Sequence, residues 1–239
     1  YDSDARDEWR KIRREVPDVA LIGNVGILQV LEAPISRIQE LVENLNARAL
    51  FVHLNVWQEC FQPERGGGLR LGGAFLALEK LVRGLTVPVI VKETGCGFSK
   101  ATLERLQNIG VSIIDVAGLG GTHWGRVEGL RQAGDSQRSQ AAHHFANWGQ
   151  STVQSLLDGQ GLRTPLWASG GMRSGLDAAK VLALGARRVG FAKPLLEAAL
   201  EGEDKLTSQM DLFEFELKVA MFCSGARKLA DLQSRWQKK

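Results

Sequence analysis

The fold is decided by the stretch Ala168-Ser169-Gly170-Gly171-Met172-Arg173. It continues the short apolar run 165–168 and precedes a helical pattern over 176–184. Glycines in such a turn let the backbone approach a phosphate, whose charge is favoured by the N–H groups and the dipole of the following helix. The segment Gly190-Phe191-Ala192-Lys193-Pro194 repeats this arrangement one unit later. We therefore predict a phosphate-binding site built from two successive loops.

Six short apolar runs alternate with helical patterns along the chain, and near-continuous apolar runs are typical of parallel strands buried on both faces. The runs are Val19–Ile22, Ala49–Leu54, Pro88–Lys92, Val111–Val116, Pro165–Ala168 and Arg188–Phe191. In phosphate-binding barrels the phosphate loops usually follow strands 7 and 8, which makes the run at 19–22 strand 3. We predict an α/β fold, a (β/α)8 TIM barrel whose strands 1 and 2 are missing from the N-terminal side, in a single domain over 1–239. An open, doubly wound sheet of six strands is the alternative.

Composition excludes several other classes of protein. The 239 residues are 44% apolar and 24% charged, with a net charge of +3 spread along the chain, so no basic patch indicates nucleic-acid binding. No apolar stretch reaches the roughly 18 residues of a membrane span. The three cysteines, Cys60, Cys96 and Cys223, form no CxxC pair, which favours a reducing cytoplasm over a disulfide framework or a zinc site.

Polar residues follow the run at 49–54. His53 and Asn55 alternate, so we expect their side chains on one face of the strand, and Gln58 and Glu59 follow in the predicted loop. The carboxyl ends of barrel strands carry the chemistry of these proteins. The simpler interpretation is a hydrogen-bonded start of a loop, and the functional one is a substrate site. A lone Glu59 suits Mg²⁺, which takes one or two carboxylates plus water and phosphate oxygens.

The next two strands end in candidate cofactor residues. Lys92 either donates to a flavin ring or pairs with Glu93, and Asp115 needs a partner if it faces the barrel interior. The loop at 118–124 contains three glycines and the hydroxyl of Thr122, which suits close contact with a flat cofactor. His123, in the same loop, is either catalytic or a hydrogen-bonded residue at the rim.

Taken in order, these motifs resemble the type 2 isopentenyl-diphosphate delta-isomerases, which are FMN-dependent barrels. The resemblance runs from Ile22-Gly23-Asn24-Val25-Gly26 to Met221-Phe222-Cys223-Ser224-Gly225. Its most specific part is His53-Leu54-Asn55 with Gln58-Glu59, followed by Gln62-Pro63-Glu64.

The resemblance implies interconversion of isopentenyl diphosphate and dimethylallyl diphosphate. It implies reduced FMN, with NADPH as the usual electron donor, Mg²⁺ on the diphosphate of a small-molecule substrate, and a homo-oligomer of four or eight chains. By the same resemblance, Gln58 contacts substrate, Glu59 holds Mg²⁺, and His53 and Asn55 line the substrate cavity. The implied FMN-binding residues are Asn24, Lys92, Thr122, Gly170, Gly171, Met172, Arg173, Ala192 and Lys193.

The sequence also departs from the family. A basic pair, a Met-Thr-Gly-Gly turn and a serine-containing loop of the family's front section are not found, which agrees with missing strands 1 and 2. Arg65-Gly66-Gly67-Gly68 replaces the usual Gly-Asp, and Lys193 stands where it would strengthen or obstruct the phosphate site. Two alternatives stay open: another FMN-dependent barrel oxidoreductase, either an oxidase with a late histidine or a dehydrogenase with a reactive cysteine such as Cys96, and a non-catalytic relic.

Overall fold

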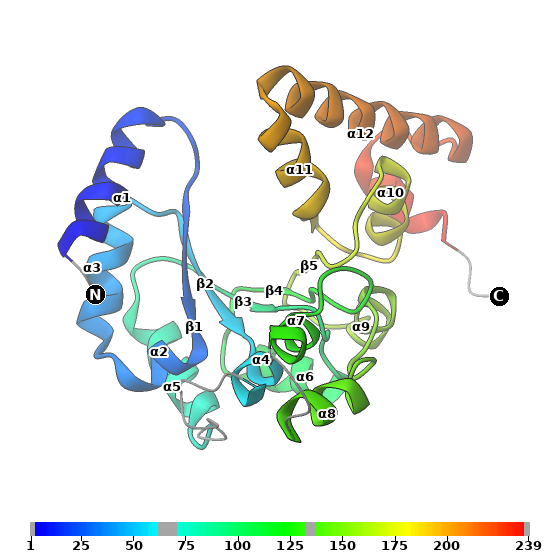
Figure 1. Cartoon of the computed structure of the whole chain (residues 1–239). Helices are drawn as coiled ribbons and strands as arrows, with labels where there is room; N and C mark the ends of the chain where they lie inside the picture. Colours follow the sequence, from blue (N-terminus) through cyan, green and yellow to red (C-terminus); the bar gives the residue numbers. More distant parts are fainter. Residues whose placement is uncertain (1–2, 62–70, 132–136, 237–239) are drawn as a thin grey trace.

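The computed structural model of the chain describes residues 3–61, 71–131 and 137–236. Six parallel strands hydrogen-bond in the order in which they occur along the chain (Figure 1). They are β1 (Ile22–Gly26), β2 (Ala49–Leu54), β3 (Val89–Glu93), β4 (Ile113–Asp115), β5 (Leu166–Ala168) and β6 (Arg188–Val189). A doubly wound sheet reverses its strand order at a switch point, whereas a barrel keeps it sequential. The predicted barrel topology is therefore confirmed, with six of its eight strands described here, and the open doubly wound sheet is wrong.

Helices follow the strands and lie around the sheet. They are α1 (Ser3–Glu15), α2 (Ile27–Glu32), α3 (Ile35–Asn44), α4 (Val56–Phe61), α5 (Ala74–Gly84), α6 (Lys100–Asn108), α7 (Trp124–Arg131), α8 (Gln137–His144), α9 (Thr152–Asp158), α10 (Gly175–Ala183), α11 (Lys193–Glu201), α12 (Glu203–Ser224) and the 3-10 helix η2 (Leu229–Ser234). In Figure 1, α1 and α3 lie near β1, at the opposite end of the sheet from α10, α11 and α12. Within the described ranges, none of the helices has the length and apolar character needed to span a bilayer.

The two faces of the sheet have different environments. On β2, Leu50 and Val52 are fully buried and pack in the main core with helix residues such as Leu81. Phe51 alternates with them and so points to the other face. Its ring meets that of Trp167 on β5 edge to face, with 6.0 Å between centroids. Side chains from strands so far apart in the sheet meet only on a concave face, which is therefore the barrel interior.

Strand register aligns polar residues on this concave face. His53 pairs with Lys92, Lys92 with Asp115, and Asp115 with Trp167. Paired residues of neighbouring strands point to the same side of the sheet. A single row near the carboxyl ends of the strands thus contains an imidazole, an ammonium and a carboxylate.

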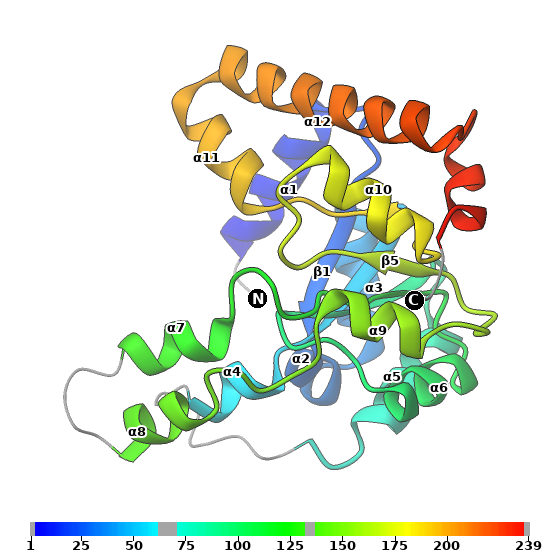
Figure 2. The same cartoon turned by 90° about the vertical axis from the view of Figure 1, so that its right-hand side faces the viewer.

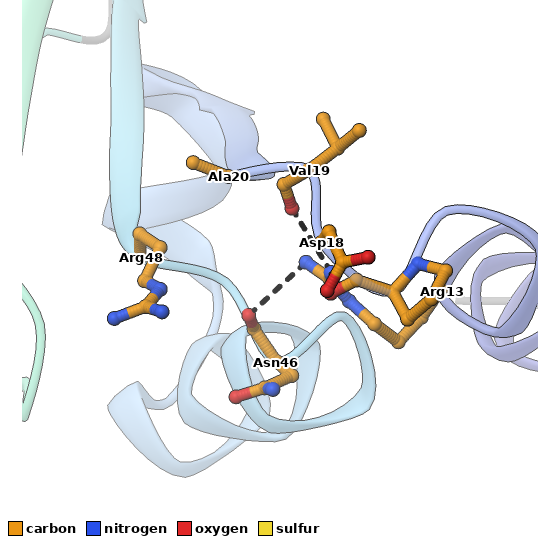
Figure 3. A pocket seen from close by; sticks show the side chains of 7 residues that line it. Arg13, Asp18, Val19, Ala20, Asn46 and Arg48 are labelled. Atoms are coloured by element: carbon orange, nitrogen blue, oxygen red, sulfur yellow. Dashed lines mark hydrogen bonds between the residues drawn. The ribbon is translucent and has the colours of Figure 1, made fainter.

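The first strand begins later in the sequence than predicted. The run Val19–Ile22 was predicted to be the strand, but pairing begins only at Ile22, opposite Ala49. The guanidinium of Arg13 donates to the carbonyl oxygens of Pro17 and Val19, both at 3.0 Å, and so holds this segment beside the end of α1. Figure 3 shows Arg13 in the surface pocket of about 430 Å³ that this segment lines. The apolar run is therefore mostly a connection that leads into the strand.

Candidate active site

The predicted site residues lie in the later part of a strand or after its carboxyl end. Asn24 lies on β1, His53 and Asn55 at the end of β2, Lys92 on β3 and Thr122 in the loop after β4; Gly170–Arg173 follow β5 and Ala192–Lys193 follow β6. The structure thus brings them to one edge of the sheet, where barrel proteins carry their chemistry. Their individual roles stay predictions, and Gln62-Pro63-Glu64 and Arg65–Gly68 lie outside the described residues.

His53 is bonded to the first strand. Its Nδ1 lies 3.1 Å from Oδ1 of Asn24. Because that amide atom accepts, Nδ1 carries the proton of the neutral ring and Nε2 is left as an acceptor. Burial, and then the neighbouring ammonium of Lys92, lower the pKa of His53 to about 4. The residue is therefore a neutral imidazole at physiological pH, and as such a hydrogen-bond acceptor.

Asn55, Gln58 and Glu59 form a connected polar group at the start of α4. The Nδ2 of Asn55 donates to Oε1 of Glu59 at 2.8 Å and to Oε1 of Gln58 at 3.4 Å. The prediction that Gln58 and Glu59 lie in a loop is wrong, because Glu59 N–H donates to the carbonyl of Asn55 within the first helical turn. Residues four apart lie on the same helix face, so this spacing itself brings the side chains together. The buried Oδ1 of Asn55 has no hydrogen-bond partner among the described residues, which indicates a place for water or a ligand.

Glu128 belongs to this group, although sequence reasoning missed it. It lies on α7 with only 4% of its surface exposed, and its Oε1 accepts from Nε2 of Gln58 at 3.1 Å. Arg131, one turn later and exposed, donates to the same oxygen at 3.1 Å. An acid on a short polar helix is usually solvated, so the residue alone gave no signal.

The glycines around Glu128 are a sequence signal from which its burial could have been predicted. A Cβ at Gly125 would overlap the ring of Trp57, and one at Gly129 would overlap Ala142. The spacing Gly-x-x-x-Gly therefore marks a face of α7 that packs closely against its neighbours, with Glu128 beside it.

Aromatic rings hold α4 and the α7–α8 segment together. The Trp57 ring centroid lies 4.4 Å from that of Phe61, 5.1 Å from that of His123 and 5.5 Å from that of Phe145. Aromatic pairs in such arrangements contribute about 0.5–1.5 kcal/mol each beyond their area burial. Figure 2 shows α4, α7 and α8 grouped on one side of the molecule. The contact between Glu128 and Gln58 depends on this packing.

Lys92 bonds to Glu93 only through the backbone. Its Nζ donates to the carbonyl oxygen of Glu93 at 3.2 Å. The carboxylate of Glu93 accepts instead from the N–H groups of Thr94, at 2.7 Å, and Cys96. Burial raises the pKa of Glu93 to about 7 against those hydrogen bonds. Burial likewise lowers the pKa of Lys92, which the charges of Asp115 and Glu93 oppose.

Asp115 has the partner that its burial requires. The hydroxyl of Ser169, at the end of β5, donates to its two oxygens at 2.9 and 3.0 Å. The N–H of Ala117 donates to Oδ1 at 3.3 Å. Burial raises the pKa of Asp115, while the Ser169 bond and the charge of Lys92 act in the opposite direction. A buried carboxyl group thus joins the ends of β4 and β5.

The predicted phosphate turn is formed by two consecutive glycines in left-handed conformation, with φ of 87° at Gly170 and 80° at Gly171. Cβ atoms there would overlap the backbone of Gly118 and Gly120, so glycine is needed for the loops after β4 and β5 to touch. Arg173 strengthens this contact, since its guanidinium donates to the carbonyl of Gly120 at 2.8 Å.

The prediction that this turn opens a helix is wrong. The helix α10 begins at Gly175, and the N–H of Gly175 already donates to a carboxylate oxygen of Glu216 at 2.6 Å. The N–H groups of Gly170, Gly171 and Met172 have no hydrogen-bond partner within the described residues. These three backbone donors, rather than the end of α10, therefore fit a phosphate.

Lys193, at which the sequence departs from the family, has an exposed side chain. Lys193 is the first residue of α11, after the cap residue Ala192, and its Nζ lies 3.5 Å from Glu197. Such an exposed pair on a helix contributes about 0.3–0.5 kcal/mol. The side chain is thus engaged with its own helix.

His123 and Cys96 do not form a reactive pair. The N–H of Arg126 donates to Nδ1 of His123 at 3.2 Å, so the ring proton is on Nε2. That atom faces the carbonyl oxygen of Trp148 at 3.3 Å and Sγ of Cys96 at 3.5 Å. Burial, and then Glu93, raise the pKa of Cys96 to about 12. The thiol is therefore protonated at physiological pH, and His123 is a hydrogen-bonded rim residue.

The fold and this site define an FMN-dependent barrel protein. Residues 71–239 match the family model described as FMN-dependent dehydrogenase. Inosine 5' monophosphate dehydrogenase from Legionella pneumophila has the same fold, with a TM-score of 0.65 and 14% identity over 99% of this chain and 77% of that one.

Two curated relatives narrow the class. An isopentenyl-diphosphate delta-isomerase from Legionella pneumophila (strain Corby) is 52% identical over 98% of this chain and 68% of its own length. One from Bdellovibrio bacteriovorus is 51% identical over 98% of this chain and 67% of its own length. The chain belongs to the isopentenyl-diphosphate delta-isomerase family of enzymes, as the sequence motifs predicted.

The protonation state of His53 can be checked directly. NMR titration of the ring is expected to give a midpoint at about 4, with assignment from the loss of the signal in His53→Asn. Because the unfolded residue titrates near 6.5, the unfolded state binds more protons between these values, so His53 makes stability fall as pH drops from about 6.5 to about 4. A midpoint near 6.5 in the folded protein would show that the ring is not held neutral.

Proposed function

We propose that the protein interconverts isopentenyl diphosphate and dimethylallyl diphosphate, using reduced FMN and Mg²⁺. The observation that carries this proposal is the hydrogen-bonded chain Asn55–Gln58–Glu128, beside Glu59 and at the same edge of the sheet as the glycine turn 170–171. The family membership of the chain supports it, since both relatives are named for this activity.

The residues present fit FMN. Three backbone N–H groups of Gly170, Gly171 and Met172 would bind the phosphate, and the glycine loop with Thr122 lies against that turn. Lys92 lies on the concave face, where its ammonium would meet the polar edge of the flavin. When bound and reduced, with NADPH as the electron source, the flavin supplies the acid–base group for the proton shift.

The reaction adds a proton at C4 of isopentenyl diphosphate and removes one from C2, so that the double bond moves without net oxidation. The protein's part is to hold the five-carbon chain so that both carbons face the flavin. Glu128 and Asn55 fix the amide of Gln58 from both sides, through its Nε2 and Oε1. His53, neutral, offers Nε2 as an acceptor and places no positive charge at this point of the cavity.

Glu59 fits a Mg²⁺ ion shared with the substrate diphosphate. Its carboxylate is buried and accepts from Asn55 through Oε1. No group of three or more His, Cys, Asp or Glu side chains with metal-binding geometry occurs in the described part of the chain. Mg²⁺ accepts such a site, because one carboxylate, water and phosphate oxygens complete its octahedral shell.

The two oxidoreductase alternatives fit less well. An oxidase needs a histidine base after a late strand, whereas β5 and β6 are followed by Ser169-Gly170 and Gly190-Phe191. A nucleotide dehydrogenase needs a reactive thiol, whereas the pKa of Cys96 is raised to about 12. A relic would have no reason to keep Glu128 buried against Gln58.

The decisive test is an assay of the full-length protein with FMN. We expect conversion of isopentenyl diphosphate only with reduced flavin and Mg²⁺ present. Glu59→Gln should lower activity about 10–100-fold at limiting Mg²⁺, the usual cost of disturbing a metal site, and higher Mg²⁺ should restore part of it.

Glu104→Gln is the matched control, because Glu104 lies exposed on α6, and its carboxylate lies 4.0 Å from the ammonium of Lys100. Its activity should equal that of the parent protein. If reduced, FMN-loaded protein left isopentenyl diphosphate unchanged, the proposed function would be wrong.

We also propose a cytoplasmic homo-oligomer of four or eight chains. The three cysteines are free thiols, as proteins of reducing compartments usually have. Large apolar side chains of α11 and α12 are exposed, among them Leu200 at 80% and Phe222 at 85%. Exposed apolar patches of this kind commonly mark contacts between proteins.

Light scattering of the full-length protein should therefore give the mass of four or eight chains. The pair of substitutions Leu200→Glu and Phe222→Glu should lower that mass, because each would bury an unpaired charge in the contact. Leu130→Glu is the control, since Leu130 is equally exposed, at 84%, but lies on α7. A monomeric parent protein would contradict the proposal.

A further inference from the structure

Asp115 is a buried acid of the concave face that is hydrogen-bonded to the ends of β4 and β5 and lies opposite Lys92 of β3. It is 5% exposed, lies opposite Lys92 in the register of β3 and β4, and accepts hydrogen bonds from Ser169 and Ala117. A hydroxyl that donates to both oxygens, and a backbone N–H that donates to one of them, favour the carboxylate over the neutral acid.

The charged and titratable groups around Lys92 come from three strands. His53 faces it from β2, Asp115 from β4, and Glu93 follows it on β3. His53 is neutral, since burial and Lys92 lower its pKa to about 4. The carboxylate of Glu93 is engaged by the N–H groups of Thr94 and Cys96. Asp115 is therefore the carboxylate that lies opposite Lys92 in the strand register, and Glu93 adds a weaker negative charge from β3 itself.

The same carboxylate supports the loops on either side. Ala117 has a φ of 35°, in a left-handed region that residues with a side chain rarely occupy, and it begins the glycine loop. Its N–H bond to Asp115 offsets that strain. Ser169, the residue before Gly170, is tied to Asp115 from the other side, so both loops that would contact FMN are joined at this carboxylate.

We propose that Asp115 is a positioning residue of the flavin site: it keeps the ammonium of Lys92 charged and directed at the cofactor, and it links that ammonium to the loops after β4 and β5. The inference rests on the FMN binding proposed above. Asp115 acts through its neighbours and need not touch substrate or cofactor itself.

The charge interaction between Asp115 and Lys92 makes flavin binding depend on pH. Burial lowers the pKa of Lys92, and the charge of Asp115 opposes that effect. A neutral residue at 115 would therefore let the pKa of Lys92 fall further, and Lys92 would lose its proton at a lower pH. Above that pH the flavin loses a cation that favours its anionic, reduced form, so both the midpoint potential and the affinity for reduced FMN should decrease.

The experiment measures FMN affinity and flavin midpoint potential against pH in full-length, FMN-loaded protein. Asp115→Asn should move the alkaline transition down by about 1–3 pH units, the effect of an adjacent opposite charge. Asp115→Glu, which keeps the charge, should retain the parental transition. If Asp115→Asn fails to fold, Asp115→Ser is a second neutral variant, whose hydroxyl still accepts from Ala117.

The variant Lys92→Arg distinguishes an effect of Asp115 on the charge of Lys92 from an effect of Asp115 on the stability of the fold. Arginine stays protonated throughout the range, so this variant should show no alkaline transition, and adding Asp115→Asn to it should change the affinity by the same factor at every pH. An unchanged transition in both neutral variants, or a pH-dependent effect of Asp115→Asn in the Lys92→Arg protein, would overturn the inference. If the parent protein bound no FMN at any pH, the proposed function would fail instead.

Discussion

The concave face of the sheet must hold a positive and a negative group away from water, and much of the structure follows from that constraint. Lys92 and Asp115 lie opposite one another because β3 and β4 pair in parallel register. A slip of one residue would turn both toward the helix-covered outer face, among Val91 and Ile114. A polar side chain turned to the apolar outer face without a hydrogen-bond partner would cost free energy, so this pair of residues also specifies the register.

The same constraint explains why the cofactor side of the site is built from touching loops. Asp115 needs a donor, and Ser169 supplies it from β5. The loops after β4 and β5 must then approach, which only glycine permits at positions 170 and 171. The substrate side is built differently, because aromatic packing around Trp57 brings Glu128 onto Gln58 from a helix inserted between β4 and β5.

Those features of the fold and of the candidate site that depend on neighbouring residues in the chain were predictable from the sequence. Apolar runs and glycine turns indicated the order of strands, and polar residues after them indicated the edge that carries the site. The first strand was placed too early, because the apolar run at 19–22 shows nothing of the bonds that Arg13 makes to its carbonyls. Gln58 and Glu59 were assigned to a loop, although their spacing from Asn55 also suits a helix. Glu128 was missed because α7 packs against α4, which is distant in sequence, as well as against the next helix, α8.

The proposed function requires the backbone N–H groups of Gly170, Gly171 and Met172 to bind the phosphate of FMN. The most direct measurement compares the affinities of FMN and riboflavin for the full-length protein by fluorescence quenching. Hydrogen bonds to a charged group contribute about 1.5–3 kcal/mol each, so FMN should bind at least about 100-fold more tightly. Gly171→Ala should abolish that preference, whereas Gly72→Ala, where a Cβ meets nothing within 4 Å, should keep it. Equal affinity for the two flavins, or a preference that survives Gly171→Ala, would contradict the claim.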